Sequence, residues 1–214
     1  MAETLAIIDY GSGNLRSVEK AVERAAREAG LARHVSVTDE PDIICKADRI
    51  ILPGVGAFAA CMSGLAARDG VLEAIEHVAL VEARPFLGIC VGMQLLASRG
   101  LEFEGSDGLG WIPGEVVPLP HSEEYRSPHM GWNEVRLTAP HPVFEELDGE
   151  AFYFAHSFHF APENDAHLYG VTRHAEDVAA LIGRDNLLGA QFHPEKSQAA
   201  GLAFLGRFLS WSPS

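Results

Sequence analysis

Residues 87–94 read Leu-Gly-Ile-Cys-Val-Gly-Met-Gln, and this stretch decides the fold that we predict. The apolar run over residues 85–89 is typical of a short buried strand, and residues 91–97 have the pattern of a helix, so Cys90 falls at the junction between them. Glycines stand two residues to either side, where a sharp strand-to-helix turn leaves no room for side chains. The spacing indicates a nucleophile elbow that carries sulfur in place of the usual hydroxyl.

An elbow of this kind would lift the Cys90 thiol above the edge of a sheet. It would also set the thiol at the N-terminus of a helix, where the helix dipole favours the thiolate. The alternative is that Cys90 packs as a small hydrophobic side chain, which is the usual fate of a free cysteine. The motif alone leaves both interpretations open.

The bulk properties of the chain indicate a single globular unit. With 214 residues, 47% of them hydrophobic, the chain is long enough to bury a substantial core, and we expect one domain over residues 1–214. Glu3 precedes a short apolar run that soon meets Asp9, a pattern of neither a signal peptide nor a membrane span. We therefore expect a cytoplasmic protein. An odd number of irregularly spaced cysteines argues against a disulfide framework and against a zinc site: Cys45, Cys61 and Cys90.

The charge is strongly acidic, with a formal net charge of -14. Binding to a phosphate backbone needs clustered Lys and Arg, so we do not expect a nucleic-acid partner. The glycine-rich turn at residues 9–14 has the position of a phosphate loop, but it lacks both a following Gly-Lys-Ser/Thr and a third fingerprint glycine. We interpret it as a tight turn and expect no cofactor.

Apolar strands alternate with helical patterns through the first half of the chain. Strands are predicted at residues 5–8, 34–37, 49–52 and 85–89, helices at 15–29, 57–65, 71–83 and 91–97, and a short acidic connection at 39–47. Such alternation predicts a mostly parallel central sheet flanked by helices, which is a three-layer, flavodoxin-like α/β fold.

The second half of the chain has a different texture. Gly, Pro and short alternating runs predict antiparallel strands within residues 107–119, 132–137 and 152–160. A further pair of strands is predicted at residues 178–182 and 187–192, followed by a helix over residues 198–209 that Ser197 would cap.

Two strand ends besides that of Cys90 carry candidate groups for chemistry. The turn Gly54-Val55-Gly56 can present bare backbone N–H groups, as an oxyanion site requires, although a plain strand-to-helix turn would look the same. His193 follows a strand end directly and can act as general base and acid. In a strand-like segment Glu195 would point to the same side and orient the imidazole.

Two other interpretations of His193 and Glu195 stay open on spacing alone. The pair could belong to a metal site, but no further ligands stand at matching spacing, because His156 and His159 would face opposite sides of one strand. His193 could also be a surface residue that never reaches Cys90. We expect no metal.

Five stretches together resemble a known family. Residues 87–96 and Gln191-Phe192-His193-Pro194-Glu195-Lys196-Ser197 resemble the class I (triad) glutamine amidotransferases. Three more stretches resemble the glutaminase subunit of imidazole glycerol phosphate synthase, the HisH family of histidine biosynthesis: residues 8–15, residues 52–58, and Pro128-His129-Met130-Gly131-Trp132-Asn133. The resemblance extends from residue 8 to residue 197.

The resemblance implies a reaction and a role for each matching residue. Cys90 would attack the side-chain amide of L-glutamine to give a glutamyl thioester, with His193 as acid and base and Glu195 orienting it. The oxyanion donors would be the backbone N–H groups of Val55 or Gly56 and of Val91. Four residues match positions beside the bound glutamine: Gly56, Gln94, Ser157 and Phe158.

The resemblance also implies a partner, a separate cyclase subunit with a (βα)₈ barrel that uses the ammonia. Asn14, Tyr153 and Lys196 match positions that the family places near that interface. One departure is Phe158, where the family commonly has tyrosine, so only a backbone contact to glutamine is expected there.

Three other functions are compatible with the triad. The chain could serve a different synthase, although residues 128–133 argue against this. It could be a catalytically silent regulatory subunit, or a general cysteine hydrolase or peptidase.

Overall fold

The computed structural model describes residues 3–213, and its centre is one eight-stranded sheet in the order β2-β1-β3-β4-β14-β13-β12-β9. The first five strands of that order are parallel: β2 (Arg33–Thr38), β1 (Glu3–Ile8), β3 (Arg49–Gly54), β4 (Phe86–Cys90) and β14 (Leu187–Ala190). The last three add in antiparallel fashion: β13 (Glu176–Arg184), β12 (Leu168–His174) and β9 (Arg136–Leu137). The predicted mostly parallel sheet is confirmed.

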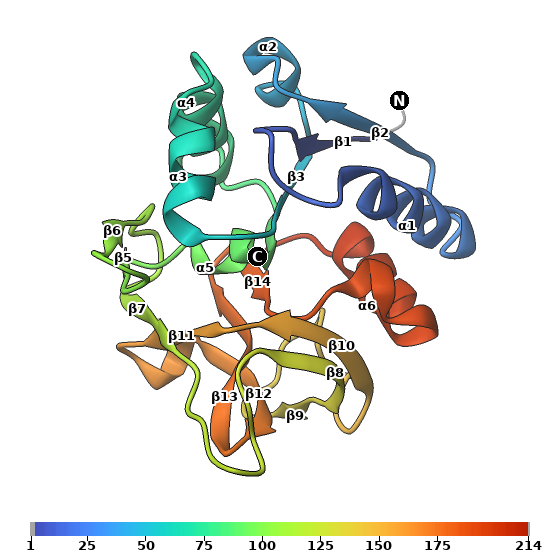
Figure 1. The fold of residues 1–214 in the computed structure, drawn as a ribbon. Helices are drawn as coiled ribbons and strands as arrows, with labels where there is room; N and C mark the ends of the chain where they lie inside the picture. Colours follow the sequence, from blue (N-terminus) through green and yellow to red (C-terminus); the bar gives the residue numbers. More distant parts are fainter. Residues whose placement is uncertain (1–2, 214) are drawn as a thin grey trace.

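Helices cover both faces of this sheet (Figure 1). On one side α1 (Leu15–Glu28) packs against α6 (Gln198–Ser210), and on the other lie α3 (Phe58–Ala66) and α4 (Val71–Glu76). Because both faces are covered, every residue of β3 and β4 is buried. The three-layer α/β fold is confirmed.

Two smaller sheets account for the rest of the second half of the chain. One pairs β8 (His129–Glu134) with β10 (Ala151–His156) in antiparallel fashion. The other has four strands: β11 (Phe158–Pro162), β7 (Gly114–Pro118), β5 (Arg99–Gly100) and β6 (Ser106–Asp107). The expected antiparallel region is therefore present, except that β5 pairs with β7 in parallel.

Three helical segments differ from the prediction. The helix expected over residues 71–83 changes after α4 into a π-helix, His77–Val81. The Asn186 side chain donates hydrogen bonds to the carbonyl of Ala79 within this π-helix and to the carbonyl of Arg84 just after it. The connection at 39–47 contains a short helix, α2 (Pro41–Ile44), with proline at its first position.

The helix after Cys90 is also shorter than predicted. α5 covers only Val91–Gln94, because the carbonyl groups of the next three residues accept hydrogen bonds from the backbone N–H groups of Leu109, Gly110 and Ile112 instead of continuing the helix. A single turn has a weak dipole, so the helix dipole contributes less to the thiolate than the sequence suggested.

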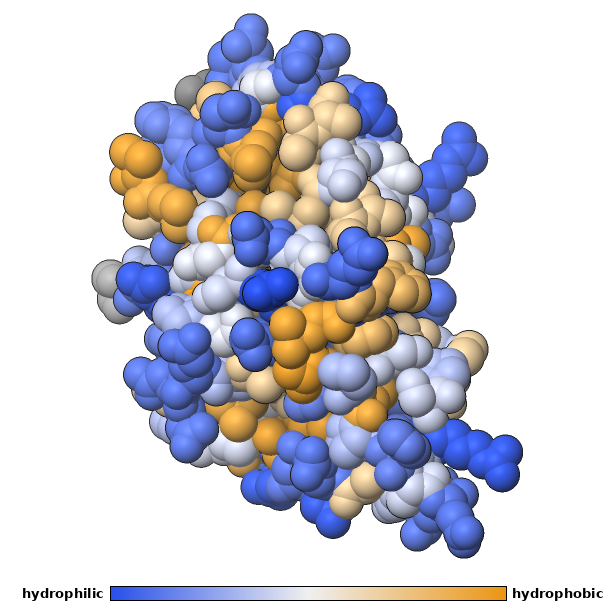
Figure 2. Space-filling view, turned by 60° about the vertical axis from the view of Figure 1, so that its left-hand side comes forward, coloured by the Kyte–Doolittle hydropathy of each residue, from blue (hydrophilic) through white to orange (hydrophobic). Residues whose placement is uncertain are grey.

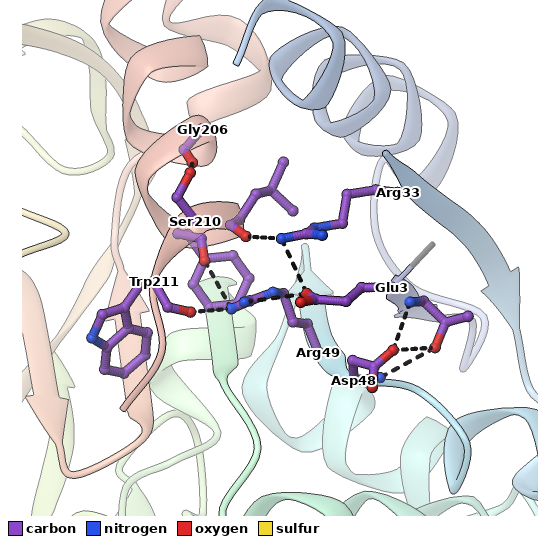
Figure 3. A network of polar contacts seen from close by, with 10 residues as sticks. Glu3, Arg33, Asp48, Arg49, Gly206, Ser210 and Trp211 are labelled. Carbon is purple, nitrogen blue, oxygen red and sulfur yellow. Dashed lines mark hydrogen bonds and ion pairs between the residues drawn. The ribbon is translucent and has the colours of Figure 1, made fainter. Parts of the chain in front are cut away.

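A network of polar contacts joins the N-terminal ends of the parallel strands to the last helix, α6 (Figure 3). The buried Arg49 guanidinium donates to the carbonyls of Phe208 and Trp211 and lies 3.4 Å from a Glu3 carboxylate oxygen. Arg33 lies 3.0 Å from the same carboxylate and donates to the carbonyl of residue 209. The network fastens α6 across the N-terminal ends of β1, β2 and β3, far from Cys90.

Figure 2 shows separate hydrophobic patches surrounded by hydrophilic side chains on the face that includes α3 and α4. Within residues 3–213, no helix has the length and apolar content needed to cross a membrane.

Candidate active site

The backbone at Cys90 has the geometry of a nucleophile elbow. Cys90 has φ 55° and ψ -112°, a strained conformation for a residue other than glycine. A Cβ atom at Gly88 would lie 2.5 Å from the Gly92 carbonyl oxygen, and one at Gly92 would lie 1.8 Å from the Leu52 carbonyl oxygen. Neither position admits a side chain, so the reason given for the two glycines is confirmed.

The sheet brings the predicted groups to one edge. β3 and β4 pair in parallel with Gly54 opposite Cys90, so the 54–56 turn begins beside the nucleophile. β14 pairs with the other side of β4, with Ala190 opposite Ile89, and the chain then passes directly to His193. The carboxyl ends of parallel strands are where ligands gather in such folds.

His193 and Glu195 form a buried pair. Their Nδ1 and Oε1 atoms lie 2.9 Å apart, and the side chains are 4% and 1% exposed. The predicted contact is therefore present, although its geometry differs from the prediction. Residues 194–196 form a 3₁₀ turn rather than an extended segment, and this turn folds the carboxylate back onto the imidazole.

The electrostatics of His193 suit an acid catalyst. Burial of the ring lowers the pKa of His193, but hydrogen bonds and charge interactions with Cys90 and Glu195 outweigh burial and raise that pKa to about 10. The imidazole therefore carries its proton at neutral pH, beside the sulfur on one nitrogen and the carboxylate on the other. The interpretation of His193 as a surface residue is wrong, because this side chain is buried at the Cys90 site.

A cavity of about 320 Å³ opens at this edge. Most predicted site residues line it: Val55, Gly56, Cys90, Val91, Gln94, Ser157, Phe158, His193 and Lys196. A larger hollow of about 900 Å³ lies between α1 and α6, but the described residues that line it include neither a cysteine nor a histidine. We therefore take the smaller cavity as the candidate active site, because it has the cysteine and histidine side chains that the larger hollow lacks.

The 54–56 turn is held by the side chains of Ser12 and Cys61. The Ser12 hydroxyl donates to the Val55 carbonyl at 2.7 Å and accepts from the Val55 N–H at 3.3 Å, and the Cys61 thiol also donates to that carbonyl, at 3.3 Å. The Val55 amide is thus engaged with Ser12 in this conformation. Val55 itself is 41% exposed, so only the Ser12 side of the turn is tightly held.

Gln94 lies in the cavity wall with its amide nitrogen already engaged. Its Nε2 donates to the Phe158 carbonyl at 2.9 Å and to Gln191 Oε1 at 3.0 Å. Gln191 in turn points its own Nε2 at Cys90 Sγ, 3.7 Å away. Sequence reasoning assigned no role to Gln191, since a polar residue directly after a strand carries no signal of where its amide points.

Two of the three residues expected at a partner interface, Tyr153 and Lys196, lie beside the cavity. The Lys196 ammonium lies 5.6 Å from the centre of the Tyr153 ring, in a cation–π arrangement, and Lys196 lines the cavity. Asn14 precedes the first residue of α1, with no side-chain cap bond. Met130 and Trp132, on β8, are exposed; they belong to the family-specific stretch 128–133 but were not assigned to the interface from the sequence.

The expectation that Ser197 caps the last helix with its side chain is wrong. Ser197 does precede α6, but its hydroxyl donates to the His193 carbonyl at 2.6 Å and accepts from the Tyr153 N–H at 3.0 Å. These two bonds fasten the histidine segment to β10 instead.

The histidines of the second half cluster in a way that spacing did not reveal. His156 ends β10, whereas His159 lies in β11, so the two are not on one strand as assumed. His156 instead meets His129 of β8, with 3.1 Å between their ring nitrogens. Within residues 3–213, no group of three His, Cys, Asp or Glu side chains is placed to hold a metal ion.

A thiol, a protonated imidazole and a buried carboxylate around a small cavity define a cysteine-dependent site for acyl transfer. The family model described as glutamine amidotransferase class-I matches residues 6–209, and the chain belongs to this family. Its fold resembles the crystal structure of a glutamine amidotransferase from Thermotoga maritima, with a TM-score of 0.64 at 14% identity over 98% of this chain and 97% of that one.

Within that class the chain belongs to the HisH family. It is 51% identical to imidazole glycerol phosphate synthase subunit HisH of Agrobacterium fabrum, over 98% of this chain and 99% of the relative. It is 52% identical to the subunit of the same name from Zymomonas mobilis, over 99% of this chain and 98% of the relative. The resemblance inferred from the motifs is confirmed.

Proposed function

We propose that this chain is the glutaminase subunit of imidazole glycerol phosphate synthase, which hydrolyses L-glutamine and passes the ammonia to a separate cyclase subunit with a (βα)₈ barrel. The observation that carries the proposal is that Cys90 and His193 line one cavity of about 320 Å³, with the buried Glu195 carboxylate bonded to His193. The family and the 51–52% identity to HisH subunits favour this synthase over another partner.

The reaction takes two steps at the sulfur. The Cys90 thiolate attacks the side-chain carbonyl carbon of glutamine, and the His193 imidazolium protonates the leaving nitrogen, so that ammonia departs and a thioester remains. His193, now neutral, takes a proton from water, whose oxygen attacks the thioester. Glutamate leaves, the sulfur is a thiolate again, and Glu195 stabilises the imidazolium that has re-formed.

Each tetrahedral intermediate carries an oxyanion that needs donors. Val91 N–H, directly after the nucleophile, supplies one, and the 54–56 turn supplies the other through Val55 or Gly56. Because the Val55 N–H is bonded to Ser12 at 3.3 Å, its use would require this peptide to turn. One missing donor costs about 10²- to 10³-fold in rate, so the turn can set the basal activity.

The cavity offers complementary groups for free glutamine. Among the described residues, Glu102 is the one acidic side chain in its lining, and it can pair with the substrate ammonium group. Since the Gln94 nitrogen is engaged, its Oε1 is the atom left to contact the substrate. Backbone groups of Ser157 and Phe158 complete the wall, and a backbone contact does not depend on the phenyl ring of Phe158.

A partner surface adjoins the cavity mouth. Met130 and Trp132 are 65% and 49% exposed, and such side chains on a charged surface are typical of protein interfaces. Trp132 packs edge-on against Tyr153, 6.2 Å between ring centres, beside Lys196. We assign this surface, with Asn14, to the cyclase.

The test is glutamine hydrolysis by the chain alone and with a barrel cyclase and its nucleotide ligand. We expect low activity alone, a large increase in the complex, and loss of both in Cys90→Ser. Cys45→Ser is the matched control, since Cys45 does not line the cavity. Retained glutaminase activity of Cys90→Ser in the complex would refute the mechanism.

Three other functions are separated by further measurements. Stoichiometric labelling of Cys90 by a glutamine-analogue electrophile in the complex would exclude a silent regulatory subunit. Cleavage of peptides without hydrolysis of free glutamine would favour a peptidase. Isolation of a different synthase with the native chain would identify another pathway.

A further inference from the structure

A line of side-chain amides leads to the nucleophile. Gln191 is fully buried, and its Nε2 lies 3.7 Å from Cys90 Sγ, within reach of a hydrogen bond to sulfur. Its Oε1 accepts from Gln94 Nε2 at 3.0 Å, and the same nitrogen donates to the Phe158 carbonyl at 2.9 Å. The sulfur therefore has a neutral donor in addition to His193.

The orientation of these amides is fixed by the Phe158 carbonyl, because a carbonyl oxygen can only accept. Gln94 must present its nitrogen to that oxygen, and it presents the second N–H to Gln191. Gln191 must therefore accept that N–H with its side-chain oxygen, and its side-chain nitrogen then faces the Cys90 sulfur. A flipped Gln191 would set oxygen against thiolate.

A second carbonyl, that of Arg173, fixes the proton positions of two neighbouring histidines. Asn133 Nδ2 donates to the Arg173 carbonyl at 2.8 Å and lies 3.2 Å from His129 Nε2, which must therefore accept. His129 then carries its proton on Nδ1 and donates to His156 Nε2 at 3.1 Å. His156 in turn carries its proton on Nδ1 and donates to the Phe158 carbonyl at 2.8 Å.

The two sets of bonds meet at the Phe158 carbonyl, which accepts from both His156 and Gln94. From Asn133 they run through His129 and His156 to the carbonyl of Phe158, and from Gln94 they run through Gln191 to the sulfur. Neutral rings are required along this path. Burial, with repulsion from His174, lowers the pKa of His129 to about 4, and burial lowers that of His156 to about 3.

We propose that Gln191 is a positioning residue for the nucleophile: its amide donates a hydrogen bond to the Cys90 sulfur, and the Phe158 carbonyl, acting through Gln94, holds that amide in the donating orientation. His156, with His129 and Asn133 behind it, donates to the same carbonyl and holds it in place. Donation to sulfur stabilises the thiolate more than the thiol, because bonds to ionised groups are the stronger ones. The thiolate role itself rests on the proposed function.

The first test measures the thiol rather than turnover. We compare the pH dependence of Cys90 alkylation by iodoacetamide, followed by mass spectrometry of the Cys90 peptide, in wild type, Gln191→Glu and Gln191→Met. Glutamate keeps the shape and can still accept from Gln94, but it has no N–H for the sulfur. The midpoint should rise by about one pH unit in Gln191→Met, because a donor to the ionised form is lost, and by at least as much in Gln191→Glu, whose carboxylate also repels the thiolate.

The matched control is Gln198→Met, a glutamine exposed at the start of α6, whose midpoint should equal that of wild type. Should Gln191→Met fail to fold, Gln191→Glu decides the matter. An unchanged midpoint in a folded Gln191→Glu would overturn the proposal. Alkylation does not need glutamine, so a failure of the proposed function would leave this result valid.

The second test addresses the orientation. Nitrogen chemical shifts of the histidine rings at pH 7 should show His129 and His156 both neutral and both protonated on Nδ1. A proton on Nε2 of either ring would remove the bond from His156 to the Phe158 carbonyl, or the bond from His129 that supports it, and would overturn the role given to the two histidines. Asn133→Leu removes the donor at the far end and should alter the ring shifts of His129 first.

Discussion

Replacing Glu195 by glutamine tests how the buried carboxylate acts on the imidazole. Glutamine Oε1 can still accept from His193 Nδ1, whose present distance to Glu195 is 2.9 Å, so the ring keeps its orientation while the charge is lost. Cys90 and Glu195 together outweigh burial and raise the pKa of His193 from 6.5 to about 10. Loss of one adjacent charge should lower this pKa by about one to two pH units.

The sign of the effect on catalysis follows from the role of His193. The imidazolium must protonate the departing nitrogen, so activity falls at high pH as His193 loses its proton. The alkaline limb of kcat/KM should therefore move to lower pH in Glu195→Gln, whereas His193 still carries its proton at neutral pH and kcat there should change less.

The assay is ammonia release by the assembled complex between neutral pH and pH 11, with circular dichroism at each pH to confirm folding. Glu195→Asp is the matched control, because it keeps the charge and should keep the limb near the wild-type pH despite a lower rate. Glu150→Gln controls for the loss of an exposed charge. An unmoved alkaline limb in Glu195→Gln would refute the reasoning, since the carboxylate would then not govern the charge of the imidazole.

Three further substitutions test the framework by thermal melting and activity. Gly92→Ala should lower stability by about 3 kcal/mol or more, because its Cβ would lie 1.8 Å from the Leu52 carbonyl, whereas Gly206→Ala meets no atom closer than 3.8 Å and should not destabilise. Arg49→Met should lower the melting temperature by about 5–10 °C, as Glu3 and two carbonyls lose their donor, with the glutaminase rate at 25 °C unchanged. Phe158→Tyr should change kcat by no more than about twofold, because the backbone carbonyl is the atom engaged.

The sequence predicted most of the sheet and the centre of the site because those features depend on local pattern. Glycines at 88 and 92 are required by contacts within a few residues of the turn and across one neighbouring strand. The apolar strands end beside Cys90 and His193, and a parallel sheet necessarily gathers such ends at one edge. Local pattern therefore predicted Cys90 and His193 as the proposed nucleophile and base, and the structure places both at one edge of the sheet.

The parts that escaped prediction depend on contacts between distant segments. Gln94 and Gln191 are 97 positions apart and meet only because β4 and β14 are neighbours. Ser197 has the position of a helix cap, yet its hydroxyl accepts a hydrogen bond from the N–H of Tyr153, 44 residues away. Spacing along the chain does not predict such pairings, because the partners of these side chains are determined by how the sheets pack.

Within the proposed mechanism, we infer which part of the site a partner would most readily adjust. The Cys90 elbow is fixed by two glycines pressed against backbone, and the His193–Glu195 pair is buried almost completely. The turn at Val55 is different, because it is 41% exposed at its tip and is held on its inner side by one hydroxyl and one thiol. Contact with this tip can exchange a bond to Ser12 for a donor at the oxyanion, a change worth about 10²- to 10³-fold in rate, without disturbing the nucleophile or its base. Control through Val55 therefore needs the least rearrangement of any group in the site.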